Sequence, residues 1–243
     1  MDLIKDFSNI EEVKSAFTSI GGRFILPAEN IKAKLADIKA FVFDWDGVFN
    51  NAFKSEVAPS LFSEIDAAGL NLMRYGHSRL IKTAPMCAII TGEENPAALH
   101  FAKREGFNFV FMKILNKIDA VNHFCKRNNI APSQIACFFD DMNDLSMAKV
   151  CGLRFMVNKS ANPGFQSIVI KNNWCDYITG AEQPNYPIRE ICELIMSLTN
   201  TYEESLTSRA NFDVPYNKFL EQKKSVKAYF VKAANVGFLE EPA

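Results

Sequence analysis

Short apolar runs alternate with amphipathic segments through the middle of the chain. The apolar runs fit buried strands at residues 40–43, 86–90, 107–111, 135–139, 153–157 and 177–179. The segments between them predict helices at residues 67–80, 96–105, 117–128, 145–150 and 187–198. Strands separated by single helices favour right-handed βαβ crossovers. We therefore expect an α/β fold with a doubly wound, mostly parallel sheet of the Rossmann-like kind.

The two ends of the chain differ from this middle part. Residues 1–38 predict an N-terminal helical extension, with Asn9 as a helix cap, and residues 39–199 form the expected core. The polar stretch 50–63 follows the first strand and favours a small β-hairpin. Residues 200–243 predict a C-terminal helical tail, with an amphipathic helix over 217–234.

The amino-acid composition narrows the possible classes of protein only modestly. The chain has 243 residues, 48% of them hydrophobic, which is enough for one substantial core. A net charge of −1 gives no argument for binding nucleic acid, and no apolar run approaches membrane-spanning length. Six cysteines without a CxxC pair indicate reduced core thiols. We accordingly expect a soluble, cytoplasmic protein that binds neither nucleic acid nor membrane.

Polar residues follow four of the predicted strands. They are Asp44 and Asp46 after the first, Thr91 and Gly92 after the second, Lys117 shortly after the third, and Asp140, Asp141 and Asp144 after the fourth. Each group alone has an ordinary explanation, such as an Asp-Gly turn or a helix cap. Because the carboxyl ends of parallel strands meet at one edge of a sheet, the fold would gather all four groups there.

This order of motifs resembles the haloacid dehalogenase superfamily, in its subfamily without a large cap. The matching segments are FDWDGVFN, AIITGEEN, ILNKIDAV and FFDDMNDLSMAKVCGL, at residues 43–50, 88–95, 114–121 and 138–153. Within the superfamily, the chain is most similar to 3-deoxy-D-manno-octulosonate 8-phosphate phosphatases and nonulosonate-phosphate phosphatases. The resemblance implies a phosphatase with Mg²⁺ as cofactor, and it favours a homo-tetramer.

The resemblance also implies a role for each matching residue. Asp44 would be the nucleophile that forms an aspartyl-phosphate, and Asp46 the general acid and then the base. Mg²⁺ would be held by Asp44, the backbone carbonyl of Asp46, and Asp140, supported by Asp141 or Asp144. Thr91 and Lys117 would hold the phosphoryl oxygens. The residues implied in substrate binding are Asn50, Thr91, Gly92 and Lys117.

Some positions depart from the resembled pattern. Asn50 stands where the sugar-phosphate phosphatases usually carry Thr or Ser, and Glu93-Glu94 follows Thr91-Gly92 where they usually have Arg. The loop 183–187 lacks the expected glycines and arginine. A substrate other than the eight-carbon acid sugar phosphate is therefore expected, because two glutamates near the entrance disfavour a second anionic group. An equally weighted interpretation leaves both glutamates in solvent at a helix N-terminus.

The leading hypothesis is a Mg²⁺-dependent phosphomonoesterase that acts on a small phosphorylated metabolite, a sugar or sugar-acid phosphate. The alternative is a catalytically weak module with an oligomerisation or regulatory role. A receiver-type domain phosphorylated on Asp44 is a third hypothesis, but a proton-transferring Asp46 suits turnover better than a stable phosphoryl mark.

Overall fold

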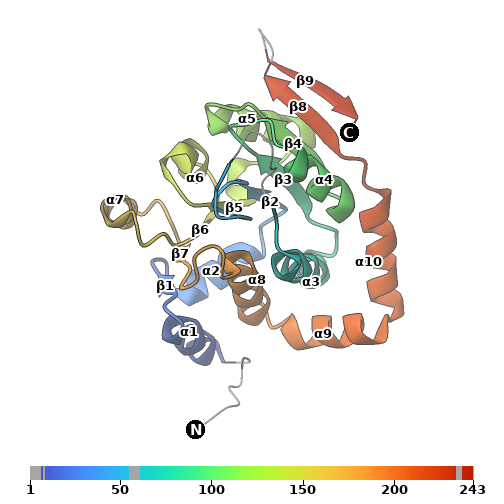
Figure 1. Ribbon diagram of the computed structural model, residues 1–243. Coiled ribbons are helices and arrows are strands. Elements are labelled where there is room, and N and C mark those ends of the chain that lie inside the picture. Colours follow the sequence, from blue (N-terminus) through green and yellow to red (C-terminus); the bar gives the residue numbers. More distant parts are fainter. Residues whose placement is uncertain (1–6, 8, 55–60, 234–236, 243) are drawn as a thin grey trace.

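The computed structural model describes residues 7, 9–54, 61–233 and 237–242, and these contain a nine-stranded sheet (Figure 1). The strand order is β1-β7-β6-β5-β2-β3-β4-β8-β9. The strands are β1 (Arg23–Phe24), β2 (Ala40–Phe43), β3 (Met86–Ile90), β4 (Phe109–Met112), β5 (Ile135–Phe139), β6 (Leu153–Met156), β7 (Tyr177–Ile178), β8 (Tyr229–Ala233) and β9 (Phe238–Pro242). Only the pairs β1–β7 and β8–β9 at the two ends are antiparallel. The expected mostly parallel α/β fold is confirmed.

Strand β2 lies at the centre of the sheet and aligns its neighbours. Phe43, its last residue, pairs with Ile89 of β3 and with Phe138 of β5. All three strands are parallel, so their carboxyl ends are nearly level. The residues that directly follow these strands, Asp44, Thr91 and Asp140, therefore emerge at the same edge.

Helices cover both faces of the sheet. They are α1 (Ile10–Ser19), α2 (Ala28–Leu35), α3 (Glu64–Ile81), α4 (Pro96–Glu105), α5 (Lys117–Asn128), α6 (Leu145–Ala148), α7 (Pro163–Lys171), α8 (Pro187–Leu198), α9 (Tyr202–Asn211) and α10 (Val214–Ser225). Side chains of β2 alternate between two cores. Phe41 and Phe43 pack with α1 to α4 and α8, whereas Ala40 and Val42 pack with α5, α6 and α7.

The sequence predicted several helix ends correctly because caps mark them. Asn9 accepts a hydrogen bond from the Glu11 amide and begins α1, and Asn95 with Pro96 begins α4. Helices α7 and α9 were not predicted.

The expected amphipathic helix over 217–234 is wrong in its second half. Helix α10 ends at Ser225, and residues 229–233 form β8, which runs parallel to β4. Tyr229, Phe230 and Val231 are aromatic or β-branched residues that suit a strand, and β8 pairs with the β4 edge that would otherwise be open. The tail is therefore two helices and a strand pair. Figure 1 shows β8 and β9 at the far end of the sheet from β1.

The described residues of the N-terminal extension, 7 and 9–38, include segments that pack on the core. Strand β1 pairs with β7, and Val13, Phe17, Ile31 and Leu35 of the flanking helices are buried in the main core. The expected hairpin over 50–63 lies partly on residues 55–60, outside the described residues, and the described residues on either side of that gap form no strand.

All six cysteines are free and buried, as expected for core thiols. Among the described residues, no helix combines the length and apolar character needed to cross a bilayer.

Candidate active site

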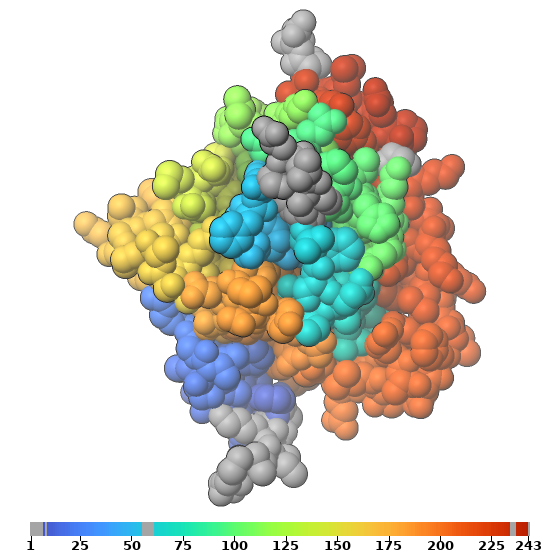
Figure 2. Space-filling model, in the orientation of Figure 1, coloured from blue at the N-terminus to red at the C-terminus, as the bar shows by residue number. Residues whose placement is uncertain are grey.

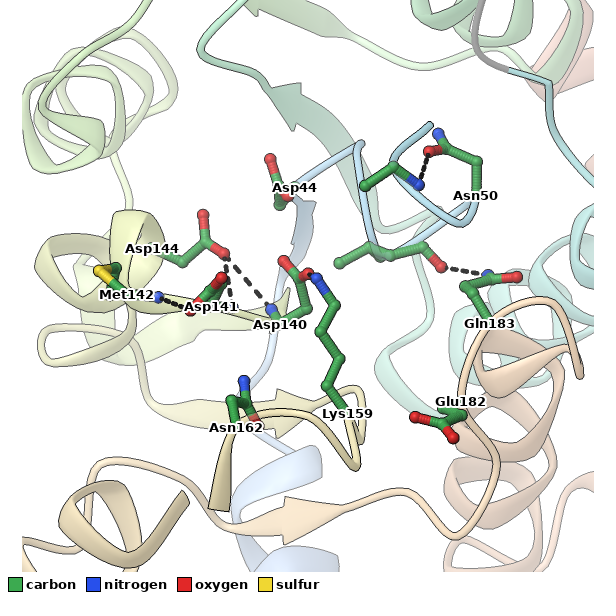
Figure 3. Close-up of polar contacts among 12 residues, drawn as sticks. Asp44, Asn50, Asp140, Asp141, Met142, Asp144, Lys159, Asn162, Glu182 and Gln183 are labelled. Carbon is green, nitrogen blue, oxygen red and sulfur yellow. Dashed lines mark hydrogen bonds and ion pairs between the residues drawn. The ribbon is translucent and has the colours of Figure 1, made fainter. Parts of the chain in front are cut away.

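A cavity of about 370 Å³ opens at the carboxyl ends of the central strands. Its polar lining consists mainly of carboxylates and lysines, namely Asp44, Asp46, Lys54, Thr91, Glu93, Lys117, Asp140, Asp141, Asn143, Asp144 and Lys159. Figure 3 shows five of them, Asp44, Asp140, Asp141, Asp144 and Lys159. The residues after β2, β3 and β5 and the start of α5, which the sequence assigned to one edge, thus meet in one cavity. Figure 2 shows the segment after β2 (blue) between the surfaces of α6 (yellow-green) and α3 (cyan).

Three buried carboxylates converge in this cavity. Asp44, Asp140 and Asp144 each offer an oxygen, and these oxygens lie within 4.8 Å of one another. The backbone amide of Asp44 donates to Phe138 O at 2.9 Å, which fixes it to β5. Asp144 Oδ2 accepts from the amides of Asp140 (3.3 Å) and Asp141 (3.4 Å), so the loop after β5 holds that carboxylate inward.

The convergence perturbs the acidity of these groups. Burial and the charge of Asp144 raise the pKa of Asp44 to about 7, against the lowering effect of Lys117. Burial and the charges of Asp144 and Asp44 raise the pKa of Asp140 to about 8. Crowded carboxylates resist ionising together unless a cation offsets them. Oxygen ligands at this spacing fit a hard divalent cation such as Mg²⁺.

The backbone conformation and the surroundings of residue 47 explain why a glycine follows Asp46. Its φ is +91°, a left-handed conformation that favours glycine. A Cβ at this position would also collide with the carboxylate of Asp140. The chain after β2 can therefore turn closely past the β5 loop only with glycine here.

Lysines offset part of the negative charge. Lys117, 3% exposed, donates to Asp44 Oδ1 and lies 2.5 Å from Asp144 Oδ1. Burial alone would lower the pKa of Lys117, but the charges of Asp44 and Asp144 raise it. Two further lysines were missed by the sequence analysis: Lys159 pairs with Asp140, and Lys54 lies 2.9 Å from Asp46. Lys159 comes three residues after β6, a strand-end signal like that of Lys117.

Thr91 and Gly92 form the cavity wall beyond β3. The Thr91 amide donates to Phe111 O (2.9 Å), and its carbonyl accepts from the Ile114 amide (3.2 Å), so the β4 segment fixes the backbone. The Thr91 hydroxyl accepts a bond from the Glu93 amide at 3.4 Å. A Cβ at Gly92 would meet only Ile114 O, at 3.9 Å, so the peptide there has open space.

Asn50 and Asp141, two expected site residues, have other contacts. The Asn50 amide donates to Trp45 O (3.3 Å) and accepts from the Ala52 amide (2.8 Å), and its side chain lies apart from the carboxylates in Figure 3. Asn50 is absent from the cavity lining given above. The Asp141 carboxylate accepts a hydrogen bond from the Met142 amide at 2.7 Å. Asp141 also lines the cavity, but Asp144 is the more deeply buried of the two.

Glu93 and Glu94, which follow Gly92, have different surroundings. Glu93 lines the cavity, whereas Glu94 is exposed and pairs with Lys113 at 2.7 Å and with Lys232 of β8 at 3.8 Å. The expectation that both glutamates act at the entrance therefore applies only to Glu93. In the loop 183–187, the Gln183 amide donates to Val48 O at 2.6 Å and so supports the turn after β2.

This fold and site define a class of protein. The family model for haloacid dehalogenase-like hydrolases matches residues 48–171, which is half of the chain. The chain belongs to this family, as its motifs predicted.

Solved structures of this family share the fold. A probable YrbI-family phosphatase from Pseudomonas syringae pv. phaseolica 1448a is 24% identical, with a TM-score of 0.61, covering 75% of this chain and 98% of that one. The 3-deoxy-D-manno-octulosonate 8-phosphate phosphatase of Moraxella catarrhalis, in complex with magnesium, phosphate and KDO, is 24% identical (TM-score 0.60; 76% and 99% covered). The cobalt-bound phosphatase of Haemophilus influenzae is 21% identical (TM-score 0.60; 74% and 99% covered).

Proposed function

We propose that this protein is a Mg²⁺-dependent phosphomonoesterase that works through an aspartyl-phosphate on Asp44. The observation that supports it most strongly is the Asp44 carboxylate, which is buried in the cavity, pairs with Lys117 and lies close to carboxylate oxygens of Asp140 and Asp144. A carboxylate becomes an effective nucleophile toward phosphorus when neighbouring cations offset the charge of both reactants.

In the first step, an Asp44 oxygen attacks phosphorus, and the bond from phosphorus to the ester oxygen breaks. Asp46 donates a proton to the departing alkoxide. The Thr91 hydroxyl, the open peptide at Gly92 and the Lys117 ammonium bind the phosphoryl oxygens. Lys117 is held beside Asp44 before substrate arrives, so little reorganisation is needed.

In the second step, water hydrolyses the aspartyl-phosphate. Asp46, now ionised, takes a proton from the water as its oxygen attacks phosphorus, and the bond to Asp44 breaks. Inorganic phosphate leaves, and Asp44 is regenerated. Lys54 lies 2.9 Å from Asp46 and pairs with its carboxylate.

The metal would be held by the carboxylates of Asp44 and Asp140, with the backbone carbonyl of Asp46, and Asp144 would support it from the next layer. When bound, Mg²⁺ supplies positive charge beside the transferring phosphoryl group. Asp144 contacts Lys117 and two backbone amides, so it orders both the lysine and the loop that carries Asp140.

The proposed substrate class is a small sugar or sugar-acid phosphate. Its support is the likeness to the Moraxella catarrhalis phosphatase, which was solved with magnesium, phosphate and KDO. A homo-oligomer, with a tetramer favoured by the family resemblance, completes the proposal.

The test is phosphate release from a panel of phosphorylated sugars and sugar acids with Mg²⁺ or with EDTA, for wild type and Asp44→Asn. We expect Mg²⁺-dependent release that the variant lowers on the order of 10³-fold or more. Asp213→Asn, a change to the capping residue of α10 far along the chain, is the matched control and should retain activity. If the folded protein binds Mg²⁺ but releases no phosphate, the alternative is favoured, namely a catalytically weak module with an oligomerisation or regulatory role.

A further inference from the structure

The loop between β7 and α8, residues 179–186, contacts the turn that carries Asp46. The side-chain amide of Gln183 donates to Val48 O at 2.6 Å, and Val48 comes two residues after Asp46. Figure 3 shows the Gln183 side chain directed at this turn. Gln183 is absent from the cavity lining given above, so an effect of its side chain on the reaction must pass through the turn.

The turn has a conformationally free position directly beside Asp46. Gly47 has a φ of +91° and no side chain, so its own sterics restrain the backbone little. Before Asp46, the carbonyl of Trp45 accepts from the amides of Val48 (3.3 Å) and Phe49 (2.9 Å). Beyond Gly47, the bond from Gln183 fixes the carbonyl of Val48 and thereby limits rotation at the glycine.

The loop that supplies this donor is itself held from two sides. The buried Glu190 of α8 accepts from the amides of Gly180 (2.9 Å) and Ala181 (2.8 Å). Glu182 accepts from the Ser160 amide at 2.9 Å, in the loop that follows β6. Because the loop is anchored in this way, it presents its donor from a fixed position and cannot simply follow a movement of the turn.

We propose that Gln183 is a positioning residue that holds the Asp46 carboxyl group where it can protonate the leaving group. This inference rests on the proposed phosphomonoesterase function and assigns a role to a residue outside the cavity lining. Proton transfer needs Asp46 within hydrogen-bonding reach of the ester oxygen, and a small displacement from that geometry is costly. A sugar alkoxide is a strong base that needs this proton, whereas p-nitrophenolate is a stable anion that leaves without it.

The test compares wild type with Gln183→Met, which keeps the length of the side chain and removes its donor. Two substrates are assayed at saturating Mg²⁺: p-nitrophenyl phosphate, and the sugar phosphate of the panel above that wild type hydrolyses best. In both cases kcat/KM reports on the first step, in which the leaving group departs. We expect Gln183→Met to lower kcat/KM roughly 10- to 100-fold for the sugar phosphate. For p-nitrophenyl phosphate the change should stay below about threefold.

Two further variants calibrate this comparison. Asp46→Asn removes the proton donor itself and should show the same selectivity with a larger loss. Asn185→Ala is the matched control, because Asn185 is an exposed amide of the same loop whose side chain makes no hydrogen bond to any residue that the structure describes. It should leave kcat/KM unchanged for both substrates.

Equal losses of kcat/KM for the two substrates in Gln183→Met would overturn the inference, because a general loosening of the site does not distinguish leaving groups. An unchanged kcat/KM for the sugar phosphate would overturn it as well. If Asp46→Asn shows no selectivity, Asp46 is not the general acid, and the inference fails with that role. No release by wild type from any compound of the panel would overturn the proposed function itself.

Discussion

The ammonium group of Lys223 lies 2.7 Å from the carboxylate of Glu105. Lys223 belongs to α10 in the tail, and Glu105 is the last residue of α4 in the core. Glu105 is 4% exposed and also contacts Asn71 and Arg104. Burial raises the pKa of Glu105, but the bonds from Lys223 and Asn71 outweigh it and lower the pKa overall. The tail is therefore held to the core by a buried polar network.

Replacing Lys223 with Met should lower the free energy of unfolding by roughly 1–3 kcal/mol, because the Glu105 carboxylate stays buried with one donor fewer. Lys224→Met is the matched control, since the neighbouring Lys224 is exposed, and it should change stability by less than about 0.5 kcal/mol. Urea unfolding of both variants measures this. Equal free energies of unfolding for Lys223→Met and Lys224→Met would show that the network around Glu105 does not hold the tail to the core.

The strand pair of the tail, β8 and β9, should also contribute to the stability of the protein, through packing. Val231 of β8 is fully buried against the core, whereas Leu239 of β9 is 61% exposed. Val231→Ala should cost roughly 1–3 kcal/mol, and Leu239→Ala little. Thermal unfolding would compare the two. A larger loss for Leu239→Ala would contradict the described pairing of β8 with β4.

Asp66 should make stability depend on pH. It is fully buried, and burial raises its pKa from 3.8 to about 6, although the Arg189 amide donates to it at 2.8 Å. The folded state thus binds this proton more tightly than the unfolded state. Its contribution is fully present below pH 3.8 and is lost as pH rises through 6.

Asp66→Asn keeps an oxygen for the Arg189 amide and removes the ionisation. Relative to this variant, the wild type should lose about 2 kcal/mol of unfolding free energy between pH 4 and pH 7. Urea unfolding at both pH values gives the difference. Parallel pH profiles for the two proteins would rule out a role for Asp66.

Lys159 should compete with the metal for Asp140. It is half-buried and pairs with the carboxylate that would bind Mg²⁺. Lys159→Met should therefore bind Mg²⁺ more tightly, by roughly tenfold, because a competing positive charge is gone. Titration calorimetry measures this without reference to turnover. Lys113→Met, which removes a lysine paired with Glu94 outside the cavity, is the control, and weaker binding by Lys159→Met would contradict the prediction.

Much of the fold could be predicted because local signals mark it. Asn95 and Pro96 begin α4, and apolar runs of four or five residues identify the central strands. The meeting of Asp44, Thr91 and Asp140 followed from one rule, that parallel strands end at a common edge.

What the sequence did not predict depends on contacts between distant segments. Strand β8 pairs with β4 about 120 residues earlier, and residues 226–233 alone are equally compatible with a continued helix. Lys54 pairs with Asp46 across a turn whose path no local pattern specifies. The contacts of the Asn50 amide, which donates to Trp45 O and accepts from the Ala52 amide, likewise depend on the path of the turn after β2.

The parallel pairing of β8 with β4 also bears on how the chain folds during synthesis. A ribosome makes residues 109–112 long before residues 229–233, so β4 remains an open edge while the rest of the core assembles. Unpaired edges of partly made sheets invite pairing with other nascent chains. Translation of residues 229–233 therefore covers the β4 edge of the sheet, and a pause shortly before these residues would lengthen the period in which neighbouring chains can aggregate.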